Sequence, residues 1–131
     1  DEKNNTDCIN CSNDLDWIFI ATVKKSIEDN MDNPSFNVDV LCNLLNMSRT
    51  SFYNKIKALT DQAPADYIRL IRLKHAAQLL KEQKHTVTEI SELTGFSAAK
   101  YFREVFKKHF NMSPSQYAKR GKEGKDDKEI K

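Results

Sequence analysis

The chain has 131 residues, of which 39% are hydrophobic, 31% are charged, 3 are Gly and 3 are Pro. This length suits one domain or two very small ones, and so few helix breakers favour an all-α fold over a sheet. No apolar run approaches the roughly 18 residues that a membrane-spanning helix needs. The first residue is Asp1 rather than Met, so we expect a fragment of a longer protein.

The charges are unevenly distributed along the chain. Residues 1–47 contain 3 Lys and Arg against 9 Asp and Glu, whereas residues 48–120 contain 14 against 6. Residues 121–131 contain 4 of each. An acidic portion followed by a basic one suggests that the basic portion faces a polyanion. The alternative is a solvated helical surface whose charges are merely uneven.

Apolar residues recur at helical spacing along most of the chain. They predict helices over about 14–31, 38–45, 49–59, 64–83, 87–94 and 98–109, and Pro114 opens another short one. We therefore expect an all-α fold of about seven helices. The predicted organisation is a leader or linker (1–13), a first helix-turn-helix subdomain (14–68), a connecting helix (64–83), a second helix-turn-helix subdomain (84–120) and a charged tail (121–131).

Residues suited to helix ends stand at the expected boundaries. Side-chain oxygens at a helix start can accept from the free amide groups of the first turn. Gly and Asn, and also Asp, adopt the left-handed conformation at the lowest cost. We expect caps at Asn13 or Asp14, Ser48, Thr86 and Ser97, left-handed turns at Asn46 and Gly95, and helix exits at Asp61 and Asn111.

Each short helix has an apolar face that should point inward. The inward residues that we expect are Val38, Leu41, Leu44, Leu45, Phe52, Ile56 and Leu59 in the first half, and Val87, Ile90, Leu93, Phe102, Val105 and Phe106 in the second.

The two halves repeat one pattern. From Val38 to Ser48 the equivalent residue lies 49 positions later, so that Ser48 corresponds to Ser97. From Phe52 onward the offset is 50, which one residue inserted at the start of the later helix explains. A short helix, a tight turn and a longer helix therefore occur twice, which predicts two helix-turn-helix motifs.

The second helix of such a motif lies in the major groove of DNA and reads base edges with its outward residues. Arg and Lys can donate to guanine, Asn can pair with adenine, and Glu can accept from cytosine. Ala can contact the methyl group of thymine, and Ser can bind phosphate. The expected DNA-binding residues are Ser48, Arg49, Thr50, Ser51, Tyr53, Asn54 and Lys57 in the first unit, and Ser97, Ala99, Lys100, Arg103, Glu104, Lys107 and Lys108 in the second.

The connecting helix over 64–83 sets the expected spacing. About 19 residues at about 1.5 Å each give a rod of about 28 Å. Successive major-groove segments on one side of DNA lie about 34 Å apart. We therefore expect the two recognition helices to reach adjacent segments of the groove from a single chain.

Two stretches carry a family resemblance: LNMSRTSFYNKIKALTDQAPADYIRLIRLKHAAQLL and VTEISELTGFSAAKYFREVFKKHFNMSPSQYAK. They resemble the DNA-binding domain of the AraC/XylS family of bacterial transcription regulators. The resemblance implies seven helices in two subdomains, recognition helices at about 49–59 and 98–109, binding to specific sequences of double-stranded promoter DNA, and activation through RNA polymerase. Asp61 and Asn111 stand where the family usually has Gly.

The run DNPSFNVDVLCNLLNMSRTSFYNKIKALT also resembles the C-terminal output domain of two-component response regulators or hybrid sensor kinases. This implies receiver or sensor domains as partners, control by phosphorylation, and an acidic first helix that connects the two parts. The expected location is the cytoplasm, because the cysteine usage suits a reducing compartment, and no membrane contact by this domain is expected.

Other classes of function have weaker support. The sequence has no paired carboxylates in an apolar setting, no Gly-rich phosphate loop and no nucleophile–base signature, so we expect no enzyme and no cofactor. Cys8 and Cys11 form a lone C-x-x-C without the four ligands of a structural zinc site, so we expect no metal, and Cys42 should be a core residue. Three cysteines without a disulfide framework suit a reducing compartment.

Two alternatives to DNA binding stay open. One is a metal or redox sensor built on the three cysteines, which a zinc assay would test. The other is a helical protein–protein interaction module that recruits the transcription machinery without reading DNA. Such a module has no need for basic residues on equivalent faces of both repeats.

Overall fold

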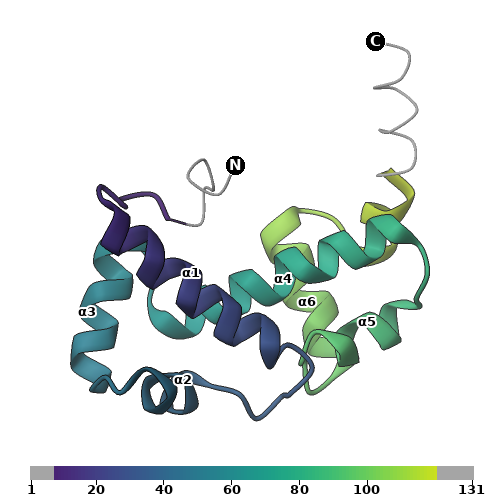
Figure 1. The fold of residues 1–131 in the computed structure, drawn as a ribbon. Coiled ribbons are helices and arrows are strands. Elements are labelled where there is room, and N and C mark those ends of the chain that lie inside the picture. Colours follow the sequence, from purple (N-terminus) through teal and green to yellow (C-terminus); the bar gives the residue numbers. More distant parts are fainter. Residues whose placement is uncertain (1–7, 121–131) are drawn as a thin grey trace. The chain divides into compact units, whose positions relative to one another are not determined.

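A computed structural model describes residues 8–120; the predicted tail and the first part of the predicted leader lie outside the described residues. The helices are α1 (Asp14–Asp29), α2 (Val38–Leu45), α3 (Arg49–Thr60), α4 (Pro64–Glu82), α5 (Val87–Leu93) and α6 (Ala99–Phe110) (Figure 1). Residues 114–120 are also helical. Over residues 8–120 the fold is therefore all-α with seven helical segments, which confirms the predicted fold class. None of the described helices is long and apolar enough to cross a membrane.

The chain divides into two compact units. The first contains the residues up to 31 and residues 35–71, and the second contains residues 32–34 and the residues from 72 onward. Because α4 runs from 64 to 82 without a break, one helix contributes to both units.

The helices of the first unit begin at polar caps. The Asn13 side chain accepts from the backbone N–H of Asp16 at 2.9 Å, so Asn13 is the cap that the sequence left open between two residues. Asn37 caps α2 through the N–H of Val40, at 3.1 Å. The Asn13 bond contributes on the order of 1 kcal/mol to stability, as is typical for such caps.

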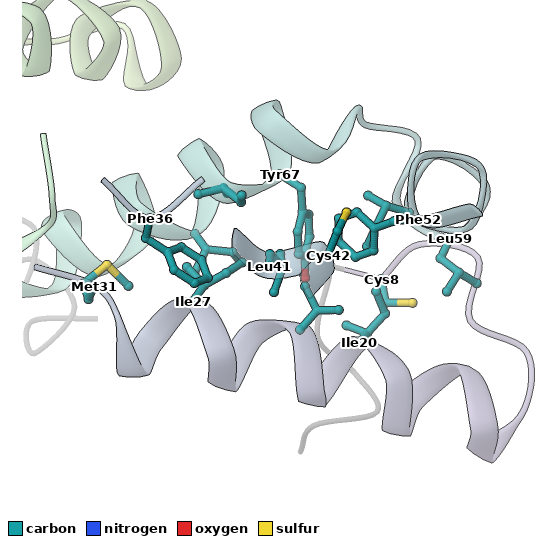
Figure 2. Packing of buried hydrophobic residues seen from close by; sticks show 14 residues of the cluster. Cys8, Ile20, Ile27, Met31, Phe36, Leu41, Cys42, Phe52, Leu59 and Tyr67 are labelled. Atoms are coloured by element: carbon teal, nitrogen blue, oxygen red, sulfur yellow. The ribbon is translucent and has the colours of Figure 1, made fainter. Parts of the chain in front are cut away.

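A core of α1, α2, α3 and the first part of α4 holds the first unit together. Ile20, Val23 and Ile27 line the buried side of α1, and Ile27 and Val23 are fully buried. Figure 2 shows Leu41 and Phe36 facing this side of α1. Phe52 and Ile56 bring α3 into the same cluster, as expected from their spacing. Burying each of these large side chains stabilises the fold by about 1.5–3 kcal/mol.

The second unit has a smaller aromatic core. Phe102 and Phe106 are fully buried, and their ring centroids lie 5.6 Å apart. Arg72 is also buried, with 5% of its surface exposed, and its guanidinium donates to the carbonyl oxygens of Thr94 (2.8 Å) and Asn33 (3.0 Å). Burial lowers the pKa of Arg72. These bonds join the segment 32–34 to the turn that follows α5.

Two leucines that we expected to point inward are exposed instead. Leu44 is 57% exposed and Leu93 is 39% exposed. In α2 the buried face is formed by Leu41 and Cys42, and in α5 by Ile90 and Ser91. Since Cys42 and Ser91 point inward, the leucine two residues later is rotated by about 200° and points away from the core. The prediction was wrong in the same way at both equivalent positions.

Candidate nucleic-acid interface

The tight turns of the two helix-turn-helix motifs contain the same backbone hydrogen bond. The N–H of Met47 donates to the carbonyl oxygen of Cys42 at 3.0 Å, and that of Phe96 donates to Ser91 at 2.9 Å. Asn46 and Gly95, which precede these donors, both have positive φ, 54° and 80°. Both pairs lie 49 positions apart, so the two tight turns are equivalent and the left-handed residues are those expected from the sequence.

The offset changes to 50 within the second turn, one step earlier than the sequence indicated. Phe52 donates to the carbonyl oxygen of Ser48, and Phe102 donates to that of Ala98, each at 3.0 Å. Ser48 therefore corresponds to Ala98, and Ser97 is the inserted residue. An apolar pattern cannot locate a single inserted residue within a turn, because the turn has no period of its own.

The starts of α3 and α6 differ for this reason. The Ser48 hydroxyl accepts from the N–H of Ser51 at 3.1 Å and caps α3, as expected. Ser97 does not cap α6, which corrects the prediction. The cap position of α6 is Ala98, whose backbone is extended (φ −144°, ψ 136°) and which makes no side-chain cap hydrogen bond.

The outward face of α3 contains the residues that the sequence assigned to DNA. Phe52 and Ile56 point into the core, which turns the opposite side of the helix to solvent. All seven candidates are exposed: Ser48, Arg49, Thr50, Ser51, Tyr53, Asn54 and Lys57. Tyr53 is a large aromatic residue with 47% of its surface exposed.

Two of these cations make contacts within the first unit. The guanidinium of Arg49 pairs with the Asp39 carboxylate of α2, and both side chains are more than half exposed. Lys57 donates to the backbone carbonyl of Asp61 at 3.2 Å. An exposed ion pair such as Arg49–Asp39 contributes only about 0–1 kcal/mol, so Arg49 can exchange its partner for a phosphate or a base at little cost.

A hollow lies along the same face of α3. It is lined by Val38, Arg49, Thr50, Tyr53, Asn54, Ala63, Pro64 and Ala65. Four of the seven candidates on α3 therefore gather around one depression, together with the first residues of α4.

The outward face of α6 is more strongly basic. The exposed candidates are Ser97, Lys100, Arg103, Glu104, Lys107 and Lys108, whereas Ala99 is half-buried. Phe102 and Phe106 occupy the opposite side of the helix and are fully buried. Four cations and one carboxylate thus follow one another along about three turns of exposed helix.

Sequence reasoning missed one prominent residue on α6. Tyr101 is 46% exposed, and its ring centroid lies 6.0 Å from that of Phe96. It is equivalent to Ser51 at an offset of 50, and Ser51 was a candidate. Tyr101 is identified when the offset of 50 is applied to each candidate residue of α3. Lys55, by contrast, lies over the ring of Phe19 at 4.4 Å from the centroid and belongs to the packing of α1 on α3.

The part of the chain that the structure describes contains no group of three or more His, Cys, Asp or Glu that could hold a metal ion. Apart from Ala99 and the Glu104 carboxylate, the candidate site consists of cations, amides, hydroxyls and aromatic rings on two helix faces. Such side chains can donate to phosphate oxygens and to base edges.

Known proteins are similar to this chain in sequence and in fold. The family described as "Helix-turn-helix domain" matches residues 41–120. Histidine kinase P4 from Formosa agariphila is 48% identical over 106 residues, which are 81% of this chain but only 8% of that protein.

Two solved structures have the same architecture. The C-terminal domain of the two-component response regulator yesN from Fusobacterium nucleatum superimposes with a TM-score of 0.70 at 27% identity, and the match covers 77% of this chain and 98% of that one. The DNA-binding domain of AdpA, solved in complex with a target DNA, matches with a TM-score of 0.69 at 26% identity, over 75% of this chain and 87% of that one. The chain therefore belongs to the AraC-type helix-turn-helix family.

Proposed function

We propose that this chain is a sequence-specific DNA-binding regulator of transcription, which places the outward faces of α3 and α6 in the major groove of a promoter. One observation carries the proposal. Two equivalent helices of one repeat both bury a face that contains Phe and expose a face of cations and polar side chains. Surface helices commonly expose polar residues, but here the exposed side has an excess of cations on both helices: α3 has Arg49 and Lys57 with no carboxylate, and α6 has four cations against Glu104. The AdpA domain, which binds a target DNA, has the same fold.

The chemistry differs between the two helices. In α3 we assign base contacts to Arg49, Tyr53 and Asn54, since Arg is suited to guanine and Asn to adenine. In α6 we assign them to Arg103 and Glu104, with Ala99 and Lys100 at the start of the helix. The hydroxyls of Ser48, Ser51 and Ser97 and the ammonium groups of Lys57, Lys107 and Lys108 are assigned to phosphates.

We further propose that both recognition helices bind one DNA molecule at adjacent groove segments. The unbroken 19-residue α4 supports this. Its length, about 28 Å at about 1.5 Å per residue, is of the order of the DNA helical repeat. Because an α-helix is stiff, any mismatch between the length of α4 and the spacing of the groove segments is relieved by bending of the DNA.

The proposed regulator is an activator that belongs to a two-component system. This chain spans 8% of the length of the histidine kinase that it resembles, and the yesN domain is the C-terminal part of a response regulator. We therefore propose receiver or sensor domains of the same polypeptide as partners that control DNA binding, and RNA polymerase as the partner on the promoter. A regulator of this class acts in the cytoplasm.

A protein-binding role without DNA is the second candidate, and one observation favours it. Leu15 and Ile18 are exposed by 76% and 60% on α1, three residues apart and so on one side of the helix. Such a pair is suited to docking against another protein. The basic faces of α3 and α6 have no role in this alternative.

Selection of bound sequences from a random pool of duplex DNA tests the proposal. We expect enrichment of one motif with two conserved patches about 10 base pairs apart. Repeating the selection at a higher salt concentration separates base contacts from phosphate contacts, because phosphate binding weakens steeply with salt. No enrichment at either salt concentration would favour the protein-binding alternative.

A further inference from the structure

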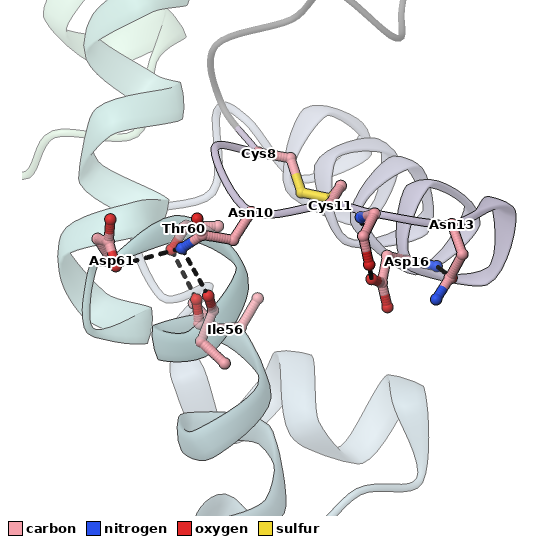
Figure 3. Close-up of a disulfide and its surroundings, with 10 residues drawn as sticks. Cys8, Asn10, Cys11, Asn13, Asp16, Ile56, Thr60 and Asp61 are labelled. Carbon is pink, nitrogen blue, oxygen red and sulfur yellow. Dashed lines mark hydrogen bonds between the residues drawn. A yellow bond between two sulfur atoms is a disulfide. The ribbon is translucent and has the colours of Figure 1, made fainter.

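The segment that precedes α1 is closed by a disulfide. Cys8 and Cys11 are bonded, and their Cα atoms lie 5.6 Å apart (Figure 3). Cys8 is 4% exposed and belongs to the core of the first unit, whereas Cys11 is only partly buried at its edge. The disulfide therefore forms a short loop with one end anchored in the core and the other end accessible from solvent.

This loop contacts the end of α3 through Asn10. The backbone N–H of Asn10 donates to the carbonyl oxygen of Leu59 at 2.9 Å. Its side-chain amide donates to the carbonyl of Ala58 at 2.9 Å and to the Asp61 carboxylate at 3.4 Å. The last four carbonyls of a helix have no partner within the helix. Asn10 therefore supplies an external cap to α3, from a position 48 residues earlier in the chain.

The cap depends on the loop being held in place. Asn10 is exposed, so water competes for the two bonds of its side-chain amide. A disulfide across a short segment reduces the number of conformations that the free segment can adopt. Opening the disulfide leaves Cys8 held by burial and Ser12 held by its N–H bond to the Asp16 carboxylate at 3.3 Å. The residues between them gain freedom, and the entropy cost of docking Asn10 rises.

Cys42, the third cysteine, is poorly suited to thiol–disulfide exchange with this pair. Cys42 is buried in the core, with 3% of its surface exposed. Burial raises the pKa of the Cys42 thiol, and the thiolate is the form that attacks disulfides. Thiol–disulfide exchange is therefore confined to the pair Cys8 and Cys11.

We propose that Cys8 and Cys11 form a reversible dithiol–disulfide site, which exchanges with a low-molecular-weight thiol couple and controls the docking of Asn10 on the end of α3. A reagent thiolate attacks the Sγ of Cys11, the less buried of the two cysteines, the Cys8–Cys11 bond breaks, and Cys8 leaves as a thiolate that takes up a proton. A second reagent thiolate then attacks the reagent sulfur of the mixed disulfide and releases Cys11. Two reagent thiols are oxidised to one disulfide, and the protein disulfide is reduced to two thiols.

The site links redox state to the first recognition helix. Lys57 lies in the last turn of α3 and donates to the carbonyl of Asp61, the same residue whose carboxylate accepts from Asn10. Loss of Asn10 from this end frees two carbonyls and loosens the last turn. This consequence for DNA rests on the proposed function, whereas the exchange and the docking do not.

The test equilibrates the 131-residue chain with defined ratios of reduced to oxidised glutathione. Alkylation and mass measurement count the free thiols at each ratio, and hydrogen exchange follows the amide of Asn10. We expect one two-electron transition and about tenfold faster exchange of this amide in the reduced protein. The amide of Phe106, deep in the second unit, serves as the internal control and should not change.

Three variants complete the test. Cys11→Ser should give fast exchange at every glutathione ratio, and it is preferred to Cys8→Ser because Cys8 is in the core. Asn10→Ala should keep the redox transition of Cys8 and Cys11, but the last turn of α3 should no longer loosen when the disulfide is reduced. Asn43→Ala, an exposed Asn of α2, is the matched control and should behave as wild type.

Two outcomes would overturn the proposal: Cys8 and Cys11 that stay in one state across all ratios, or Asn10 exchange that is the same in both states. The affinity for the selected DNA is measured in parallel and is expected to fall about threefold on reduction, a modest effect because only one helix end changes. If the pair titrates and Asn10 responds but no DNA is bound, the proposed function fails and the redox site stands. If DNA is bound but the pair does not titrate, the redox site fails and the function stands.

Discussion

Asp61 and Asn111, 50 positions apart, end the two recognition helices in the same left-handed conformation, with φ of 62° and 63°. Their backbone N–H groups donate to the carbonyls of two equivalent lysines, Lys57 at 2.9 Å and Lys107 at 2.7 Å. Neither is Gly, the residue that takes this conformation most cheaply. Both helix ends therefore depend on the tolerance of Asp and Asn for positive φ.

Asn111→Ala should destabilise the protein by about 1 kcal/mol, because an Ala at positive φ has its Cβ too close to the following carbonyl oxygen. Asn111→Gly is the matched control and should stay within about 0.5 kcal/mol of wild type, since Gly relieves the strain but gains freedom in the unfolded chain. Denaturant unfolding measures both. Equal stability of the Ala and Gly variants would show that this end of α6 is not constrained.

Ala98→Ser should stabilise the second unit by about 0.5–1 kcal/mol, because Ala98 has the extended backbone of a cap but no side-chain acceptor. Ser48→Ala should destabilise the protein by about 1 kcal/mol, because it removes the hydroxyl that caps α3. Ser97→Ala is the control, and it should leave the midpoint of thermal unfolding unchanged. A loss of stability in the Ser97 variant would restore Ser97 as the cap and shift the repeat back by one residue.

Arg103→Ala should relax the base preference of the protein and cost roughly 1–3 kcal/mol on the selected site, as for a true base contact. Lys107→Ala should instead weaken binding to specific and random DNA alike and reduce the salt dependence by about one phosphate contact. Fluorescence anisotropy with labelled duplexes at several salt concentrations measures both. Equal losses on specific and random DNA in the Arg103 variant would remove that residue from the base-reading set.

Glu89 links the cap of α5 to pH. The backbone N–H of Thr86 donates to its carboxylate at 2.8 Å, and this bond is the main reason why the pKa of Glu89 lies below the ordinary value of 4.5. A depressed pKa contributes stability that is present above the ordinary value and is lost as the pH falls through the pKa in the folded protein.

The variant Glu89→Gln isolates this contribution. Thermal unfolding should show the variant less stable than wild type at neutral pH, and the gap should narrow as the pH falls below about 4.5, the ordinary value. Glu92→Gln, at an exposed carboxylate on the same helix, is the control. A gap for Glu89→Gln that does not change with pH would mean that the ionised carboxylate does not stabilise the cap.

Much of the fold follows from local chemistry in the sequence. The helical periods, the caps at Ser48 and Thr86 and the left-handed exits at Asp61 and Asn111 depend only on neighbouring residues, and the structure confirms them. The outward position of the candidate residues on α3 and α6 follows from the buried Phe and Ile residues on the same helices. What those outward residues bind stays a prediction.

The features that the sequence did not reveal are mostly non-local. The contact of Asn10 with α3 joins positions 48 apart, and no period or motif points to it. The same holds for Arg72, whose buried guanidinium bonds carbonyls 22 and 39 positions away. We expected the three cysteines to form no disulfide framework, and the Cys8–Cys11 disulfide shows that this expectation was wrong for two of them. The inserted Ser97 was misplaced because a turn has no periodic signal.

Hydroxyl-radical footprinting of the wild-type chain on its selected DNA site is the most direct test of the central claim, that α3 and α6 both read one DNA molecule. We expect two protected patches about 10 base pairs apart, with Arg49→Ala weakening one patch and Arg103→Ala the other. A single patch that both variants weaken alike, or protection that does not depend on the DNA sequence, would contradict it.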